Sequence, residues 1–361
     1  MAQPRRVLSP NGLPEIGMSP MPVSTMRAEC PSAAASSRGP EIAELSAVIC
    51  TRNRTLLLQR ALASLLDQDL PPAELLVIDN APASSATRDL LHARFPQVRY
   101  VHESIPGLDM ARNRALREAR HAIVAFLDDD AVADRGWARA IAQVFEDERV
   151  GVCTGRVEAL TLDTAGQRLF EANGGFSRGQ ARIRLPEDAR RFLHGWRAPM
   201  IAWAVSVGNG ASFAVRRALA MQLGGFDEAL DLGEPLPGGG DLDMFWRALA
   251  VGRALVYEPT VVAWHEHRTT CEEVAQQLAG HQRALVAFLC KTAHDPNGQA
   301  RLPILGFLAW RLVKPGVRLV RRALGRDPLP ARALWSIWAA ALQGVGAYPA
   351  ARRIANRRRT G

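Results

Sequence analysis

The sequence lacks the features of a secreted or membrane-spanning protein. Its five cysteines are widely spaced and form no Cys-x-x-Cys pair, which argues against a disulfide framework or a zinc site and fits a reducing compartment. No apolar run approaches the roughly 18 residues of a spanning helix. The first residues also lack the apolar centre of a signal peptide. From these absences we expect a cytoplasmic protein.

Acidic residues are nearly missing from one end of the chain. Residues 301–361 hold 13 Arg or Lys and a single acid, Asp327, whereas the preceding 300 residues hold 32 basic and 35 acidic side chains. The hydrophobic fraction of 48% and the charged fraction of 22% are an ordinary globular balance. The formal charge of +9 therefore describes a near-neutral body with a basic tail.

The first part of the chain predicts disorder followed by alternating strands and helices. Residues 1–40 are rich in Pro, Ser, Ala and Gly without periodicity, which predicts disorder. The patterns then predict strands at 45–51, 73–80, 98–102 and 121–128, and helices at 55–67, 84–94 and 107–120. Such alternation favours an α/β fold with a Rossmann-like, mostly parallel sheet and helices on both faces.

Beyond residue 150 the pattern indicates a mixed sheet and then a helical tail. We expect strands at 151–159 and 205–215, a helix within 238–252, and a strand, a turn and a second strand within 254–267. A helix is expected from about residue 272, and the basic tail repeats helical spacing with a break at Pro315. The predicted parts are a disordered segment (1–40), an α/β domain (41–290) and a basic amphipathic helical extension (291–361).

Three consecutive carboxylates follow the last predicted parallel strand, in FLDDDA (126–131). Because side chains alternate along a strand, Asp128 and Asp130 can point to the same side. Such oxygen ligands suit Mg²⁺ or Mn²⁺, which also bind substrate phosphates. A solvated turn with a helix cap is the alternative interpretation.

Five further segments come in a distinctive order. They are CTRNR (50–54), VIDN (77–80), GLDMARNRAL (107–116), GGFDEAL (224–230) with GGGDLDMFWRAL (238–249), and YEPTVVAWHEH (257–267). Together with the acidic trio they resemble the family 2 glycosyltransferases, which have the GT-A fold. The resemblance runs from about residue 45 to residue 290, roughly two-thirds of the chain.

The resemblance implies a site for a nucleotide-sugar donor, most commonly a UDP-sugar. Asp79 would accept a hydrogen bond from the nucleotide base, and Asp128, Asp130 and His265 would hold Mn²⁺ or Mg²⁺ against the diphosphate. The remaining residues expected to bind the donor are Thr51, Asn53, Arg112 and Asp129, although an Arg on a helix is often simply solvated.

The resemblance also implies an acceptor site with Asp241 as the general base. The helix dipole should favour its ionised form, and a helix cap is the alternative role. The family usually has Glu before this Asp, where this chain has Gly240, and we expect Asp243 to share the acceptor contacts. We also expect Asn209 and Gly210 to line the acceptor cleft. Trp196, Trp203 and Trp246 either stack on a sugar or pack in the core.

The basic tail mixes Arg with Leu, Val, Phe and Trp at near-helical spacing. Such a pattern suits a helix in the interface of an anionic membrane, here the inner face of the cell membrane. A helical extension packed on the catalytic domain is the alternative. Nucleic-acid binding is not expected, because no recognised module accompanies the charge.

The sequence thus predicts an inverting, metal-dependent glycosyltransferase that acts on a glycan or lipid-linked hydroxyl acceptor in envelope or polysaccharide synthesis. A nucleotidyltransferase is disfavoured, because CTRNRTLLL (50–58) has no glycine for a phosphate loop. A catalytically degenerate module that binds nucleotide sugar or glycan at the membrane surface is the second alternative.

Overall fold

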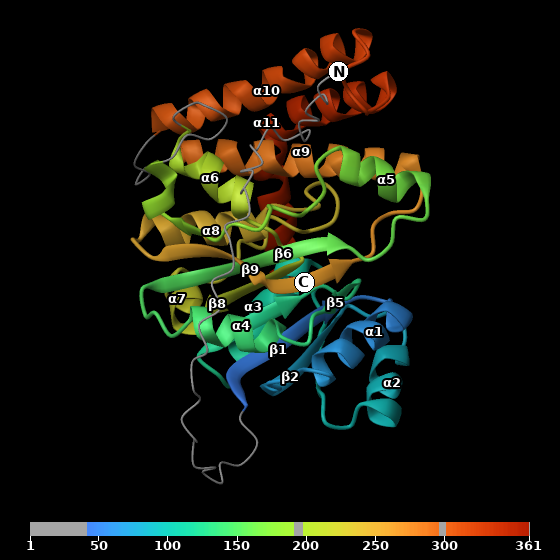
Figure 1. Cartoon of the computed structure of the whole chain (residues 1–361), viewed down its shortest axis with the longest axis vertical. Helices are drawn as coiled ribbons and strands as arrows, with labels where there is room; N and C mark the ends of the chain where they lie inside the picture. The colour runs from blue at the N-terminus through green and yellow to red at the C-terminus, as the bar shows by residue number, and fades with distance from the viewer. Residues whose placement is uncertain (1–41, 191–197, 296–300, 361) are drawn as a thin grey trace, which may run out of the picture.

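The computed structural model describes residues 42–190, 198–295 and 301–360 (Figure 1). The predicted disorder of residues 1–40 and the role of Trp196 lie outside these ranges. The strands are β1 (Ala43–Thr51), β2 (Pro72–Asn80), β3 (Arg99–Glu103), β4 (Ile123–Leu127), β5 (Ala131–Ala133), β6 (Val150–Ala159), β7 (Ile183–Leu185), β8 (Ser212–Arg216) and β9 (Ala254–His265). The helices are α1 (Thr55–Leu66), α2 (Ala86–Arg94), α3 (Leu108–Glu118), α4 (Trp137–Val144), α5 (Ala165–Ala172), α6 (Met200–Val207), α7 (Arg217–Gln222), α8 (Gly240–Ala250), α9 (Cys271–His294), α10 (Arg301–Ala323) and α11 (Ala331–Thr360), and a short 3₁₀ helix spans Glu187–Arg190.

One mixed sheet organises the described residues. Its order is β3-β2-β1-β4-β8-β6-β9-β5, and β7 pairs with β9. Strands β3, β2, β1 and β4 are mutually parallel, and β6 and β9 run the same way, so six of the nine strands in the described ranges share a direction. The predicted α/β fold with a mostly parallel mixed sheet is confirmed.

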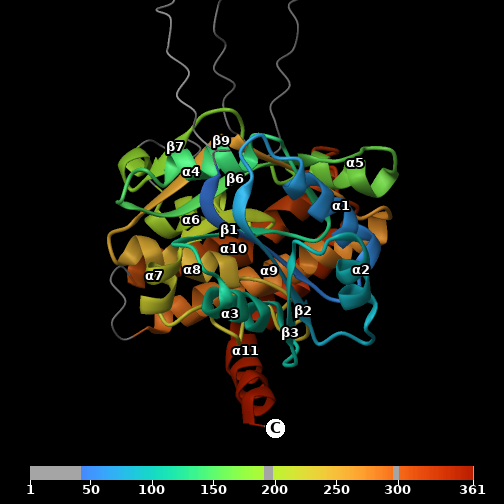
Figure 2. The ribbon, with the colours of Figure 1, turned by 90° about the horizontal axis from the view of Figure 1, so that it is seen from below.

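Helices cover both faces of the sheet, as the alternation along its strands requires. In β1, Ala47 and Ile49 pack into one apolar cluster, with helices α1, α2 and α4. Val48 points to the other face and joins the cluster formed with α3, α6, α7 and α8. The view in Figure 2 shows the strands between these helices. Because each strand has two apolar faces, its sequence is almost continuously hydrophobic.

Three local predictions need correction. The strand expected at 205–215 is the end of α6, a turn at 208–211 and then β8, since the two glycines interrupt the pattern. The segment 254–267 holds one strand, β9, whose pairing with β6 shifts register between Glu258 and Val262, around Pro259. Helix α10 continues through Pro315, which is buried, so packing compensates for the missing backbone hydrogen bond.

The C-terminal helices pack on the α/β domain. Helix α9 begins at a capping box in which Thr270 and Glu273 each bond the other's backbone N–H. Helices α10 and α11 pack against it, at the opposite end of the molecule from α1 and α2 (Figure 1). Helix α11 then runs past α3 (Figure 2), where Ala351 and Ala355 share an apolar cluster with Met110. No helix in the described ranges has the length and hydropathy of a membrane span.

Candidate functional site

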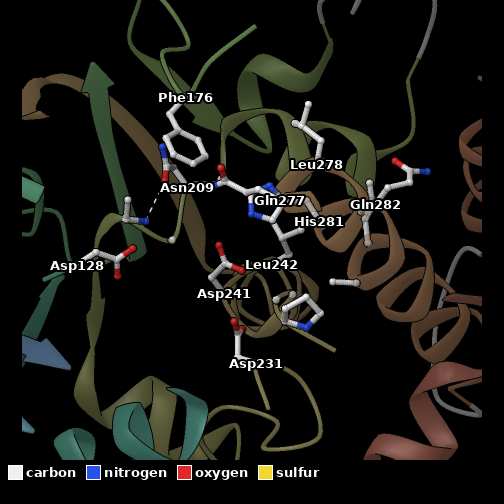
Figure 3. A pocket seen from close by; sticks show the side chains of 18 of the residues that line it. Asp128, Phe176, Asn209, Asp231, Asp241, Leu242, Gln277, Leu278, His281 and Gln282 are labelled. Carbon is white, nitrogen blue, oxygen red and sulfur yellow. Dashed lines mark hydrogen bonds between the residues drawn. The ribbon is translucent and has the colours of Figure 1, made fainter. Parts of the chain in front are cut away.

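A cleft of about 1000 Å³ opens at the carboxyl ends of β1, β2 and β4. Its walls come from the loops after these strands, the turn before β8, the N-terminus of α8, and one side of α9 and α10. Figure 3 shows Asp241 between Asp128 on the strand side and Gln282 on α9. Ligands of open α/β sheets bind at this edge, because the strand ends leave a crevice there.

Two of the predicted metal ligands follow β4, and the third ends β9. Asp128, Asp130 and His265 each offer one ligand atom, and these atoms lie within 4.8 Å of one another. The sheet brings them together, because Ala131 of β5 pairs with His265 in antiparallel register. Two carboxylates and one imidazole are a donor set that fits Mn²⁺ or Mg²⁺.

The charges around these ligands are unevenly balanced. Burial and the neighbouring Asp130 raise the pKa of Asp128. Burial acts against ionisation of Asp130 too, but its contacts with His265 and Arg54 lower its pKa. The Asp130 Oδ1 to His265 Nε2 distance is 3.2 Å, and Arg54 donates to Asp130 Oδ2 at 3.1 Å. The opposing charges of Arg112 and His265 do not offset these effects at Asp128, and a divalent cation would favour its ionised form.

A buried chain of hydrogen bonds extends behind His265. Its Nδ1 lies 3.0 Å from Nδ1 of His267, whose Nε2 lies 2.7 Å from Glu171 Oε1 on α5. If His267 donates to the carboxylate, its Nδ1 accepts the Nδ1–H of His265. The Nε2 lone pair of His265 is then directed at the two aspartates. The arrangement is typical of the partners that orient a metal-ligating histidine.

The third acid of the trio has a different environment. Asp129 accepts hydrogen bonds from Thr51 Oγ1 at 2.7 Å and from Arg54 at 3.0 Å. It thereby ties the loop after β1 to the loop after β4. Thr51 and Asp129 both line the cleft, but their side chains are hydrogen-bonded to each other.

The other residues expected to contact the nucleotide lie beside the cleft rather than in its wall. Asn53 has φ +58° and accepts from the backbone N–H of Ala83 at 2.8 Å, which joins the loops after β1 and β2. Asp79 is fully buried; Tyr100 donates to its Oδ2 at 3.1 Å, and burial raises its pKa. Its Oδ1 is buried and has no hydrogen-bond partner among the described residues, and its contact with the nucleotide base stays a prediction.

Asp241 begins α8 and faces the cleft. Backbone N–H groups at the helix N-terminus and Arg112 favour its ionised form, but burial and the nearby Asp231 outweigh them and raise its pKa to about 6. The helix dipole alone predicted the opposite direction. A carboxylate with a pKa near 6 is ionised at neutral pH and is a stronger base than an ordinary one.

Arg112 stands among acids at this end of the cleft. It donates to Asp109 at 3.0 Å and to Asp231 at 3.4 Å, and its guanidinium lies 5.6 Å from the ring centres of Phe213 and Phe226. Its buried contacts thus hold the acids around Asp241. The diphosphate contact predicted for Arg112 remains a prediction, since the side chain also lines the cleft.

The structure explains the missing Glu before Asp241. A Cβ atom on Gly240 would lie 1.7 Å from Oδ2 of Asp109, so the space that a side chain would need is filled by a carboxylate from α3. Asp109 is itself fully buried, and burial together with Asp231 raises its pKa well above the usual range. An acid is therefore present beside the base, although it comes from another part of the chain.

The turn before β8 lines the cleft as expected, whereas Asp243 does not. A Cβ on Gly210 would lie 2.6 Å from Oδ2 of Asp241, so glycine allows the close approach. Asn209 accepts from the N–H of Ala211, and its amide nitrogen is buried without a partner in the described ranges. Asp243 is buried between Arg247 at 2.8 Å and Lys291 at 2.6 Å. Asp243 is therefore ion-paired outside the cleft wall, and its expected share in acceptor contacts stays a prediction.

Two other predictions concerned tryptophans. Trp203 of α6 is buried in the apolar cluster that α6 forms with α3, α7, α8 and the sheet. Trp246 packs against the cluster that contains residues of α9 and α10. Neither lines the cleft. Sequence reasoning also missed side chains that do shape it, since only the fold reveals their proximity; they are Arg54, Asp109, Asp231, His281, Gln282 and the basic residues of α10.

Comparison with known families gives an independent assignment. Residues 46–203 match the family model "Glycosyl transferase family 2". This range contains the loop after β1, the acidic trio and helix α3. The resemblance drawn from the sequence motifs is therefore confirmed over this segment.

Relatives and solved structures agree with the family. The Pre-mycofactocin glycosyltransferase of Mycobacterium tuberculosis is 27% identical over 292 residues, 79% of this chain and 56% of that protein. The chain thus spans about half the length of this curated relative. The Probable N-acetylgalactosaminyltransferase 9 of Caenorhabditis elegans is 27% identical over 176 residues, 45% of this chain and 28% of that protein. The mannosyltransferase PcManGT from Pyrobaculum calidifontis, solved with GDP-Man and Mn²⁺, has a TM-score of 0.52 at 20% identity and covers 89% of this chain and 90% of its own. This last likeness shows the fold.

Proposed function

From the premise that residues 46–203 are a glycosyl transferase family 2 segment, we propose that the chain is an inverting glycosyltransferase. It moves a sugar from a nucleotide-diphosphate sugar to a hydroxyl acceptor. The observation that carries this proposal is that a carboxylate with a raised pKa, Asp241, and the Asp128–Asp130–His265 cluster face the same cleft. A transferase needs both. The diphosphate gains negative charge as it leaves the anomeric carbon, and the acceptor hydroxyl that attacks this carbon must lose its proton.

The donor binds at the strand side of the cleft. A bound Mn²⁺ or Mg²⁺ would stabilise the charge that develops on the departing diphosphate. Asp128, Asp130 and His265 would hold the cation, and Arg54 favours the ionised form of Asp130 through its hydrogen bond. The neighbouring mannosyltransferase fold was solved with GDP-Man and Mn²⁺, which supports a nucleotide sugar and a metal as ligand classes. A UDP-sugar remains our expectation for the donor.

Asp241 receives the acceptor proton. The acceptor oxygen forms a bond to the anomeric carbon as its O–H proton passes to Asp241. The bond between that carbon and the diphosphate oxygen breaks, and its electrons leave with the nucleoside diphosphate. Attack from the side opposite the leaving group inverts the configuration. Asn209 and Gly210 line the cleft beside the base, where the acceptor would bind.

Nucleotide binding tests the proposal directly. We expect calorimetric titration to show binding of one of UDP, GDP and dTDP, and to show it only with Mn²⁺ or Mg²⁺. Asp128→Asn should abolish the metal dependence, whereas the exposed Asp163→Asn should not change it. Folded protein that binds none of the three with metal present would instead favour the degenerate module.

The hydrogen-bond chain behind His265 gives a graded prediction. His267→Leu leaves the His265 Nδ1–H without its acceptor, so we expect Mn²⁺ affinity to fall by roughly 10-fold or more. Glu171→Gln should have a smaller effect, because the amide oxygen still accepts from His267. Electron paramagnetic resonance of free Mn²⁺ measures both without substrate. Exposed Glu272→Gln serves as the control. Equal Mn²⁺ affinities in the original protein and the three variants would show that these hydrogen bonds do not support the metal site.

The C-terminal helices belong to the proposal as a peripheral membrane contact. One face of α10 exposes the large apolar side chains of Trp310, Val313, Val317 and Val320, and Leu324 follows directly after the helix end. Their three- and four-residue spacing forms a continuous stripe that would lie on the inner face of the cell membrane. Such a contact suits a lipid-linked or envelope glycan acceptor, with residues 41–290 as the catalytic domain and 291–361 as its helical extension.

A further inference from the structure

A second face of α10, next to the apolar stripe, is basic and lines the cleft. Arg311, Lys314, Arg318 and Arg321 follow one another at helical spacing, and all four contribute to the cleft wall. Only Arg318 is neutralised: it donates to both carboxylate oxygens of Asp327, at 2.7 and 2.8 Å. Within the described ranges, Arg311, Lys314 and Arg321 form no ion pair. The wall therefore carries uncompensated positive charge toward the cavity.

Arg311 is held in place by α9, and Lys314 lies half-buried one turn further along the helix. Gln282 of α9 donates to the backbone carbonyl of Arg311 at 3.0 Å and accepts from its guanidinium. The Nε of Arg311 is buried and has no partner among the described residues. Burial and the neighbouring Arg311, Arg318 and Arg321 lower the pKa of Lys314 to about 7. Such crowding of partly buried cations is unfavourable in isolation, and a bound anion would relieve it.

The position of this charge distinguishes it from the donor site. Gln282 lies on the far side of Asp241 from Asp128 (Figure 3), and the diphosphate of the donor is assigned to the Asp128 side. An anion on the α10 side would therefore belong to the other substrate. A hydroxyl of that substrate would reach Asp241 while its charged end contacts α10.

We propose that Arg311, Lys314 and Arg321 form a subsite for a phosphate group carried by the acceptor. This assignment rests on the proposed transferase function and narrows its acceptor to a phosphorylated molecule. Arginine and lysine are the side chains that bind phosphate oxygens most strongly, through charge-assisted hydrogen bonds. The phosphate can come from a soluble acceptor or from a lipid whose chain lies along the apolar stripe of α10.

The test separates this subsite from the donor site by leaving out the metal. Phenyl phosphate is titrated calorimetrically into the full chain in EDTA, where the Asp128 side repels anions. We expect measurable binding, and a loss of roughly 10-fold or more in Arg311→Gln/Lys314→Gln, since two charge-assisted contacts disappear. The matched control is Arg332→Gln/Arg353→Gln, which removes the same charge from exposed positions of α11. Equal affinity in both double variants would overturn the subsite.

A second arm identifies the source of the phosphate. Phosphatidylcholine vesicles with and without phosphatidic acid are sedimented with each variant. Retention that requires phosphatidic acid together with Arg311 and Lys314 assigns a lipid phosphate, while binding of phenyl phosphate alone assigns a soluble acceptor. Absence of both bindings would refute the subsite. Metal-dependent nucleotide binding is also measured on Arg311→Gln/Lys314→Gln. If this variant still binds nucleotide and also binds phenyl phosphate as tightly as the original protein, the subsite is refuted and the transferase proposal stands.

Discussion

Replacing Asp241 by Asn is expected to lower kcat by roughly 10²–10⁴-fold, the usual contribution of a general base. The change is nearly isosteric and keeps the hydrogen bonds from the N-terminus of α8, so the fold should be retained. The proposed donor site around Asp128 lies on the other side of the cleft. The metal-dependent affinity for nucleotide should therefore stay within a few-fold of that of the original protein. Steady-state turnover and calorimetric nucleotide binding measure the two effects separately.

The same residue should control the pH dependence of turnover. Burial and Asp231 raise the pKa of Asp241 to about 6, and a base acts only when it is deprotonated. Turnover should therefore be constant above about pH 7 and fall tenfold for each unit below pH 6. The profile is measured at saturating donor and Mn²⁺, because Asp128 also titrates when the metal is absent. The residual activity of the Asn variant should lack this step.

Two outcomes would contradict the assignment of the base. Full turnover in Asp241→Asn would show that another group takes the acceptor proton. Loss of nucleotide binding along with turnover would show that Asp241 supports the cleft as a whole. The exposed Asp67→Asn, which removes a carboxylate far from the cleft wall, controls for the general effect of losing one negative charge.

Much of the fold was predictable because it depends on local pattern. Strands buried on both faces give continuous apolar runs, as in β4, and amphipathic helices repeat every three to four residues, as Leu58, Leu62 and Leu65 do in α1. The sequence failed where pairing depended on distant partners. The two strands expected in 254–267 are one, because β6 supplies a continuous neighbour and the irregularity near Pro259 is absorbed as a register shift.

The candidate site shows the same division. Strand periodicity predicted that Asp128 and Asp130 lie on one side; they do lie together, although in the turn between β4 and β5 and not in a strand. The family motif indicated His265 and Asp241, whose roles stay predictions. The charge state of Asp241 was not predictable, because the sequence reveals the helix dipole there but neither the burial of Asp241 nor the nearby Asp231, which together outweigh it. Asp243 follows Asp241 by two residues on α8, so it points in another direction, toward Lys291 instead of the cleft. Motif spacing locates a residue along the chain, whereas burial and neighbours decide what its charge does.

Gly240 provides the second large effect, because restoring the family's usual Glu should damage this protein. A Cβ at this position would lie 1.7 Å from Oδ2 and 2.5 Å from Cγ of Asp109. Asp109 cannot move aside, since it is fully buried on α3 and held by Arg112. Gly240→Glu should therefore lower the free energy of unfolding by about 3 kcal/mol or more, through overpacking and an added buried charge. Chemical denaturation measures the loss.

A double-mutant cycle shows whether Asp109 is the cause. Asp109→Ala removes the colliding carboxylate, so Gly240→Glu/Asp109→Ala should be more stable than the Glu variant alone, with a coupling of about 1–3 kcal/mol. Gly346→Glu is the matched control, because a Cβ there meets no atom within 4 Å. If the double variant also regains turnover, the two positions supply one acid between them: the family places it on the residue before the base, and this chain places it on α3. A Gly240→Glu protein as stable as the original would refute that exchange.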